Sequence, residues 1–434
     1  MRTLLNAVLL LCTTAVMLFG PATAVAAGSD RTGTVTRMDF SGSGRIPLRP
    51  DPTVEKPFTE IEPHWKEGQP MLAVAYVSGT IPVVGITLDV PGQNLSATTI
   101  VRGVGPDGID FPPTPVAPSV AGTHATLVYP PHSASRPFQP GAICSYEPFT
   151  ISWETSVDGG AHWKAQAESR CTLYITRSSP VREAPETGYA FFESLFAMSC
   201  RNASGAASDS AIIKGIWTQF ADRSVRLLSG DTLAFYRHKN AAPETTTGGL
   251  IFTKTGICFA WAHLLIDLLR VQGIQPHNSY VVLSTPESTQ YGPVVGMLIQ
   301  NCQFMTPSGT VECPDYPYVA AFDPHTNLDL VGPDVFSRPG IAAQGEPDPV
   351  SLFRNHALVC LDGVYYDPSY GRTYASIDEF YNVIAGWVVL GRGNEMAMKF
   401  DLNGDGTIDN TDVTVGRVSN NPHRLALNVT RQDY

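Results

Sequence analysis

Residues 254–265 read KTGICFAWAHLL, and this stretch decides the predicted fold. A glycine stands two residues before Cys258, and apolar residues then recur at helical spacing as far as Gly273, a plausible helix stop. The pattern predicts a helix over residues 256–273 with Cys258 in its first turn. Free backbone N–H groups and the helix dipole favour an anion there, so the position is typical of a nucleophilic thiolate. The alternative is a buried or disulfide-bonded cysteine. We expect Gly256 to let a substrate backbone approach the thiol.

A nucleophilic thiol needs a base, and the base needs an orienting group. Residues 355–369 read NHALVCLDGVYYDPS, in which Asp362-Gly363 is a strong signal for a two-residue hairpin turn. In the register set by this turn, Leu358 lies opposite Asp367, and His356 is the diagonal neighbour of Asp367 on the same face. An imidazole and a carboxylate can bridge the ~7–8 Å between those backbones. The alternative for His356 is an ordinary surface histidine on a strand.

The other histidines fit the role of base less well. His263 follows Cys258 by five residues on the same helix, so we expect its side chain to point elsewhere. His277 falls in a turn between a helix and a strand. His325 is the rival base, but no hairpin places a carboxylate beside it.

Three motifs in this order carry a family resemblance: G-x-C before an apolar helix, N-H-A at residues 355–357, and a hairpin that ends in Y-D-P. Together they resemble the transglutaminase-like domain of the papain-like superfamily, over roughly residues 185–395. The resemblance implies that Cys258 is the nucleophile, His356 the base and Asp367 the orienting acid. Two departures stand out. Leu358 occupies a position that is usually aromatic in the family, and the histidine-to-aspartate gap is shorter than usual.

The resemblance implies acyl transfer on a peptide or protein substrate. Cys258 would attack an amide carbonyl to form a thioester, which water then hydrolyses or an amine converts to a new amide. An oxyanion donor is expected upstream of the cysteine, for which Trp217 and Tyr236 are candidates beside the backbone N–H of Cys258. The chain would then be a peptidase or amidase, or a transglutaminase-type transamidase. The alternative is a non-catalytic extracellular binding or surface protein built on an inactive domain of this type.

The rest of the chain divides into regions of different sequence periodicity. Residues 57–180 show short strands between turn signals and no helical periodicity, which predicts an all-β domain, most simply an immunoglobulin-like sandwich. Helical spacing then appears at residues 189–198 and 207–228, and strands follow later, which is the α+β class. The predicted fold class is therefore multidomain: an N-terminal all-β sandwich followed by an α+β domain of the papain-like/transglutaminase-like type, over residues 185–395.

The N-terminus predicts export. Residues 1–26 combine an early arginine, an apolar run and a small-residue A-x-A ending, which is the pattern of a secretory signal peptide cleaved near Ala26. Residues 28–56 are interpreted as an irregular leader. We predict a secreted, extracellular or periplasmic protein with no membrane insertion after cleavage. The formal net charge of -11 and the lack of any basic cluster argue against a nucleic-acid partner.

The cysteine count also bears on Cys258. The chain has eight cysteines, and Cys12 leaves with the signal peptide. Seven in an exported protein suggest one free thiol. Local spacing favours two disulfides, Cys302–Cys313 and Cys144–Cys171, which would leave Cys200 to pair with Cys360 and Cys258 unpaired.

The C-terminal tail, residues 399–434, contains a calcium-loop pattern. Oxygen-bearing side chains and one backbone carbonyl fall at EF-hand loop positions, with glycine at position six. The predicted ligands are Asp401, Asn403, Asp405, Thr407, Asp409 and Asp412. The loop resembles that of dockerins, although a polar turn is the alternative. A dockerin has two such loops and this tail has one, so a cohesin-type partner is not expected. We predict one structural calcium ion and no cofactor for catalysis.

Overall fold

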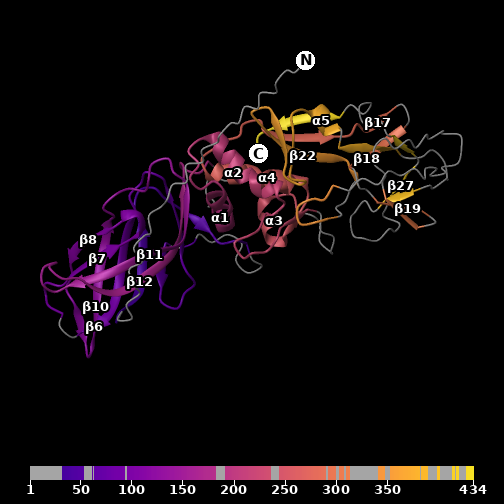
Figure 1. Cartoon of the computed structure of the whole chain (residues 1–434). Helices are drawn as coiled ribbons and strands as arrows, with labels where there is room; N and C mark the ends of the chain where they lie inside the picture. The colour runs from indigo at the N-terminus through magenta and orange to yellow at the C-terminus, as the bar shows by residue number, and fades with distance from the viewer. Residues whose placement is uncertain are drawn as a thin grey trace, which may run out of the picture.

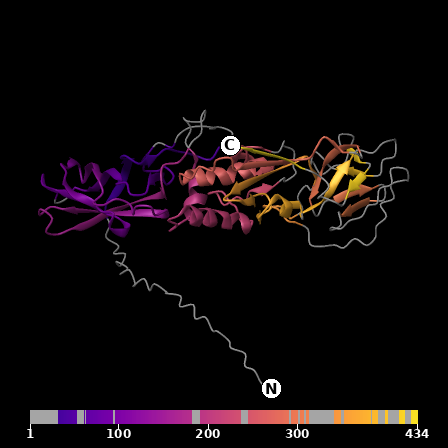
Figure 2. The same ribbon diagram turned by 90° about the horizontal axis from the view of Figure 1, so that it is seen from above.

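A computed structural model describes sixteen stretches of the chain. They are residues 32–52, 61, 63–92, 95–181, 191–235, 244–289, 292–299, 303–306, 309–312, 341–347, 352–381, 383–389, 398–400, 413–415, 417–419 and 427–434. These ranges are mostly β-sheet and contain five α-helices. The molecule is elongated: a β-rich part forms one end, α1 to α4 lie in the middle, and further strands form the other end (Figures 1 and 2). None of the helices in these ranges has the length and apolar character that spanning a bilayer demands.

Two sheets form the N-terminal part and enclose a core of their own. The first has the order β4 (His64–Lys66), β1 (Thr34–Ser41), β6 (Val83–Pro91), β10 (His124–Ser133), β9 (Ser119–Ala121). The second has the order β2 (Arg45–Ile46), β5 (Ala73–Val77), β12 (Lys164–Thr176), β11 (Cys144–Ser156), β7 (Ile100–Val104), β8 (Phe111–Pro115), with the 3-10 turn η1 (Pro106–Gly108) between β7 and β8. Alternate residues of both sheets, such as Leu88 and Trp153, are fully buried between them. The strand pattern predicted for residues 57–180 therefore forms two packed β-sheets.

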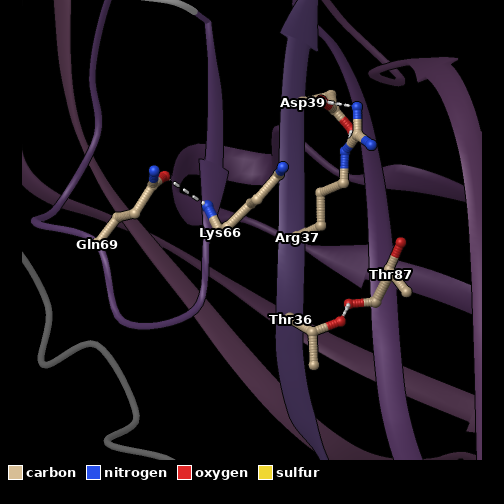
Figure 3. A network of polar contacts seen from close by, with 6 residues as sticks. All are labelled: Thr36, Arg37, Asp39, Lys66, Gln69 and Thr87. Carbon is tan, nitrogen blue, oxygen red and sulfur yellow. Dashed lines mark hydrogen bonds and ion pairs between the residues drawn. The ribbon is translucent and has the colours of Figure 1, made fainter.

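The interpretation of residues 28–56 as an irregular leader is wrong for the described part. Strand β1 pairs with β6 along its whole length, with Val35, Met38 and Phe40 buried in the sandwich core. A register shift between Val35 and Arg37 breaks the strict alternation of buried and exposed residues, which conceals the strand in the sequence. The Thr36 hydroxyl donates to the backbone carbonyl of Thr87 on β6, and on the exposed side of β1 the guanidinium of Arg37 pairs with Asp39 at 2.8 Å (Figure 3).

The predicted Cys144–Cys171 disulfide is also wrong. Strands β11 and β12 do form a hairpin, but Cys144 lies opposite Ile175 while Cys171 lies opposite Phe149. Cys171 and Ile175 are four positions apart on β12, about 13 Å along a strand, and a disulfide requires Cα atoms less than about 7 Å apart. All the cysteines in the described ranges are free: Cys144, Cys171, Cys200, Cys258 and Cys360.

Of the other two predicted disulfides, one is contradicted and one lies outside the described residues. The sulfur of Cys200 is buried 3.6 Å from the carbonyl of Ile175, whereas Cys360 lies 3.6 Å from the guanidinium of Arg431 on another sheet. Their separate neighbours exclude the predicted pair. Cys302 and Cys313 lie outside the described residues, as does the predicted signal peptide. Cys258 is therefore not singled out as the one unpaired thiol.

The helices follow the sandwich. They are α1 (Glu193–Asn202), α2 (Asp209–Ala221), α3 (Thr247–Thr253), α4 (Cys258–Val271) and the short α5 (Ile377–Tyr381). Apolar residues on almost all sides of α4 are buried, because α1, α2, α3 and β22 all pack against it. Its neighbouring sheet has the order β24 (Arg372–Tyr374), β23 (Val364–Asp367), β22 (Asn355–Leu361), β16 (Tyr280–Ser284), β29 (Asn428–Gln432). The last strand brings the C-terminus back beside α4 (Figure 1).

The other strands are smaller units. Two short pairs join segments that are distant in the sequence: β3 (Leu48–Arg49) with β13 (Phe191–Phe192), and β14 (Ala234–Phe235) with β15 (Thr255–Gly256). One outlying sheet consists of β17 (Ser288–Thr289), β18 (Gly292–Ile299), β25 (Ile384–Val389) and β28 (Arg417–Ser419), with β21 (Leu352–Phe353) beside β18. The other consists of β20 (Gly309–Glu312), β19 (Gln303–Thr306), β26 (Met398–Phe400) and β27 (Val413–Val415).

Candidate active site

Local backbone structure fixes where α4 begins. Ile257, the N-cap residue, is extended, and its N–H donates to the carbonyl of Glu244 at 3.0 Å. Just before Ile257, strand β15 pairs in parallel with β14, and this pairing fixes the position of the chain that leads into α4. Cys258 is thus the first helical residue, as predicted, with a side chain that is only 2% exposed. The N–H groups of the first turn have no acceptor within the helix and remain available to an anion.

Gly256 has a different role from the predicted one. It is buried, and it bridges Glu244 in parallel fashion. A Cβ atom on Gly256 would lie 2.9 Å from Cβ of Ala260 and 3.1 Å from Leu250, closer than side-chain atoms normally approach. The glycine therefore allows β15 to pack under α3 and α4. The expectation that it makes room for a substrate backbone is wrong, because the protein itself fills that space.

The hairpin that carries His356 and Asp367 has the predicted turn and register. Asp362 and Gly363 both take positive φ angles, 49° and 83°, as a two-residue type I′ turn requires. Val359 lies opposite Tyr366 in the β22–β23 ladder. This register makes His356 and Asp367 diagonal neighbours across the two strands.

The side chains of His356 and Asp367 meet. Nε2 of His356 lies 2.9 Å from Oδ2 of Asp367, and both side chains are 0% exposed. A buried ion pair without water around it forms a strong hydrogen bond because little screening weakens it. Nδ1, the other ring nitrogen, is buried and makes no hydrogen bond in this conformation. The Cys258 side chain lies near enough to the ring to contribute to the raised pKa of the histidine. The imidazole thus binds the carboxylate through Nε2 and leaves Nδ1 free to face a reacting group.

The pKa of His356 is raised despite its burial. Burial by itself lowers the pKa of a histidine, since it disfavours the charged ring. The charge and hydrogen bond of Asp367 outweigh it, and the nearby Cys258 side chain adds to them, so that the pKa rises to about 10. The ring is therefore an imidazolium at neutral pH, the form that can stabilise a thiolate and later donate a proton.

Contacts that sequence reasoning missed hold Asp367 in place. Its Oδ1 accepts the backbone N–H of Tyr370 at 3.4 Å, and its Oδ2 accepts the Tyr374 hydroxyl at 3.3 Å. The ring of Phe380 stacks on the His356 ring, with centroids 5.7 Å apart and planes 10° apart. The aromatic residues that follow the Y-D-P motif were the available signal, but their bonds depend on how β24 and α5 fold back.

The other predicted residues lie elsewhere or outside the described ranges. His263 stacks on Tyr434, with ring centroids 3.5 Å apart, and burial lowers its pKa to about 4, so it is not part of the Cys258 group. His277 is exposed. Trp217 packs against Tyr366, with centroids 4.9 Å apart, and its role as an oxyanion donor stays a prediction. Tyr236 and the rival base His325 fall outside the described residues.

The predicted calcium loop cannot be placed. All six residues lie outside the described ranges: Asp401, Asn403, Asp405, Thr407, Asp409 and Asp412. Within the ranges that are described, no group of three or more His, Cys, Asp or Glu side chains could hold a metal ion. The calcium ion therefore stays a prediction from the sequence.

No protein-family model matches the chain, and no curated protein matches it. The functional interpretation of the site therefore rests on its residues and their geometry.

Proposed function

We propose that this chain is a secreted cysteine-dependent acyl-transfer enzyme with Cys258 as nucleophile, His356 as base and acid, and Asp367 as the orienting group. The observation that supports it most is the buried His356–Asp367 pair at 2.9 Å, with the Cys258 side chain near enough to contribute to the raised pKa of the histidine. Nucleophile, base and orienting group in contact are the arrangement that covalent catalysis by a thiol needs.

The proposed reaction has two steps. Cys258 Sγ attacks a substrate carbonyl carbon, and the oxyanion that forms is stabilised by free N–H groups in the first turn of α4. The carbon–nitrogen bond then breaks as His356 donates its proton to the leaving amine, which leaves a thioester on Cys258. In the second step, water or a second amine attacks the thioester, His356 takes the proton of the attacking group, and the sulfur departs as thiolate.

The class we propose is transglutaminase-like, within the papain-like superfamily. The order cysteine, histidine, aspartate and the placement of the thiol at the start of a central helix support it, together with a sheet whose hairpin carries the other two residues. The substrate class is a peptide or protein amide. Hydrolysis and transamidation share the acyl-enzyme, so the acyl acceptor decides between peptidase and transamidase. We retain the structural calcium ion at residues 401–412 as part of the proposal.

Formation of a thioester on Cys258 tests this function. With p-nitrophenyl acetate as acyl donor at neutral pH, we expect a burst of one p-nitrophenolate per protein. Intact-mass and peptide mapping should then place one acetyl group on Cys258, removable by neutral hydroxylamine. Adding a primary amine during turnover should give the amide if the enzyme is a transamidase. Cys258→Ala should abolish the burst, and Cys200→Ala is the matched control that should keep it.

An acetyl group on other residues, or a full burst in Cys258→Ala, would contradict the proposal. A non-catalytic binding protein is the second candidate, and the burial of Cys258 at 2% exposure is the observation in its favour. A substrate must be admitted to a thiol that is covered in this conformation. Small acyl donors reach covered thiols more readily than proteins do, which is why the experiment uses one.

A further inference from the structure

We propose that Tyr374 is a positioning residue that sets the basicity of the His356–Asp367 pair, an inference that rests on the proposed function. Its hydroxyl is 3.3 Å from Oδ2 of Asp367, the same oxygen that bonds His356 Nε2 at 2.9 Å. One carboxylate oxygen thus accepts two donors, one from the base and one from the tyrosine. The contacting residues are all buried, with Tyr374 only 3% exposed.

Tyr374 is a donor that does not lose its proton at working pH. Burial, with the charge of Asp367 next in effect, keeps the pKa of Tyr374 well above its ordinary value. The hydroxyl therefore donates to Asp367 throughout the range in which an acyl-transfer enzyme would work. A hydrogen bond to the ionised form favours that form, so Tyr374 helps Asp367 to stay charged without contact with water.

Aromatic packing holds the ring of Tyr374 in a fixed position near His356. It packs edge-on against Phe380, with centroids 5.4 Å apart and planes 80° apart, and Phe380 in turn stacks on His356. Strand β24 pairs with β23 so that Tyr374 lies opposite Tyr365, two residues from Asp367 on the same strand face. The position of the hydroxyl is therefore determined by both sheet register and aromatic packing.

Because Oδ2 accepts both hydrogen bonds, loss of the Tyr374 hydroxyl should change the basicity of His356 in one direction. Electron density that Oδ2 shares with Tyr374 is not available to His356, so removing the hydroxyl strengthens the bond from Asp367 to the imidazolium. Tyr374→Phe should then hold the proton on His356 to a higher pH. Tyr365→Phe is the matched control, since its hydroxyl bonds to Arg431 and not to Asp367.

The measurement is the pH profile of Cys258 alkylation by iodoacetate, mapped by mass spectrometry. The imidazolium attracts this anionic reagent, so its deprotonation gives the profile a descending basic limb. We expect that limb to move up by about half a unit to one unit in Tyr374→Phe, which corresponds to the net free energy of one ordinary hydrogen bond. Tyr365→Phe should keep the wild-type profile. Melting temperatures of all three proteins are recorded alongside.

An unchanged profile in Tyr374→Phe, whatever its melting temperature, overturns the inference and reduces Tyr374 to a packing residue. That result would leave the proposed function intact. If iodoacetate does not react selectively with Cys258 in the wild type, the proposed function is contradicted as well. If Tyr374→Phe does not fold, 3-fluorotyrosine introduced at position 374 keeps the ring and makes the hydroxyl a stronger donor. The basic limb should then move to lower pH, and a limb that stays or rises contradicts the inference.

Discussion

Replacing Asp367 with asparagine should lower the rate of acyl-enzyme formation about 10²–10⁴-fold while leaving Cys258 in place. Asparagine has nearly the same shape, so the buried site can still close around it. Its amide carries no charge to stabilise the imidazolium, and its N–H₂ group can face Nε2 and stabilise the wrong tautomer of His356. The measurement is the single-turnover burst with p-nitrophenyl acetate at pH 7.

Asp378→Asn is the matched control for this prediction. Asp378 lies on α5, close in sequence to the site, but its side chain is exposed. We expect its burst rate to stay within about twofold of wild type, as for most exposed substitutions away from a site. A burst rate in Asp367→Asn that is also within about threefold of wild type would mean that the carboxylate does not act on the base.

The second large effect is a loss of stability with rising pH. His356 has a pKa of about 10 in the folded protein, compared with about 6.5 in an unfolded chain. Between these values the folded state binds the extra proton, so stability falls as pH rises. The contribution of His356 is fully present below about pH 6.5 and lost above about pH 10. At about 1.4 kcal/mol per pKa unit, the difference between the two pKa values amounts to about 5 kcal/mol.

Urea unfolding at several pH values between 6 and 10 measures this loss. Other groups also titrate in this pH range, so the wild type is compared with His356→Gln. Glutamine keeps a polar side chain of similar size but does not titrate. The wild type should lose more stability than the variant, with the difference opening between pH 7 and pH 10. Parallel curves for the two proteins would contradict a charged His356 in the folded state.

The sequence was most informative where structure is local. Asp362-Gly363 prefers positive φ angles at two successive residues, which fixes the turn, and the turn fixes which residues of β22 and β23 face each other. That is why the approach of His356 to Asp367 could be predicted. The helix from Cys258 was predictable because its apolar spacing continues for several turns.

Features that depend on distant contacts were not predictable. A register shift hides β1 in the sequence. The turn between β11 and β12 is long, so the sequence did not determine that Cys144 lies opposite Ile175 and not opposite Cys171. Gly256 looked like a site for substrate because its close neighbours, such as Leu250, come from α3 and could not be foreseen. The pairing of the C-terminal strand β29 with β16 joins residues almost 150 positions apart.

The most direct test of the central claim is the rate at which iodoacetamide modifies Cys258 at pH 6, mapped residue by residue. Burial raises the pKa of Cys144 to about 11, so this partly exposed thiol is an internal reference that should not react. If Cys258 is paired with a protonated His356, we expect it to react at least about tenfold faster than Cys144, although it is more buried. His356→Gln should remove this advantage. Equal or slower reaction of Cys258, or an advantage that persists in His356→Gln, would contradict the account.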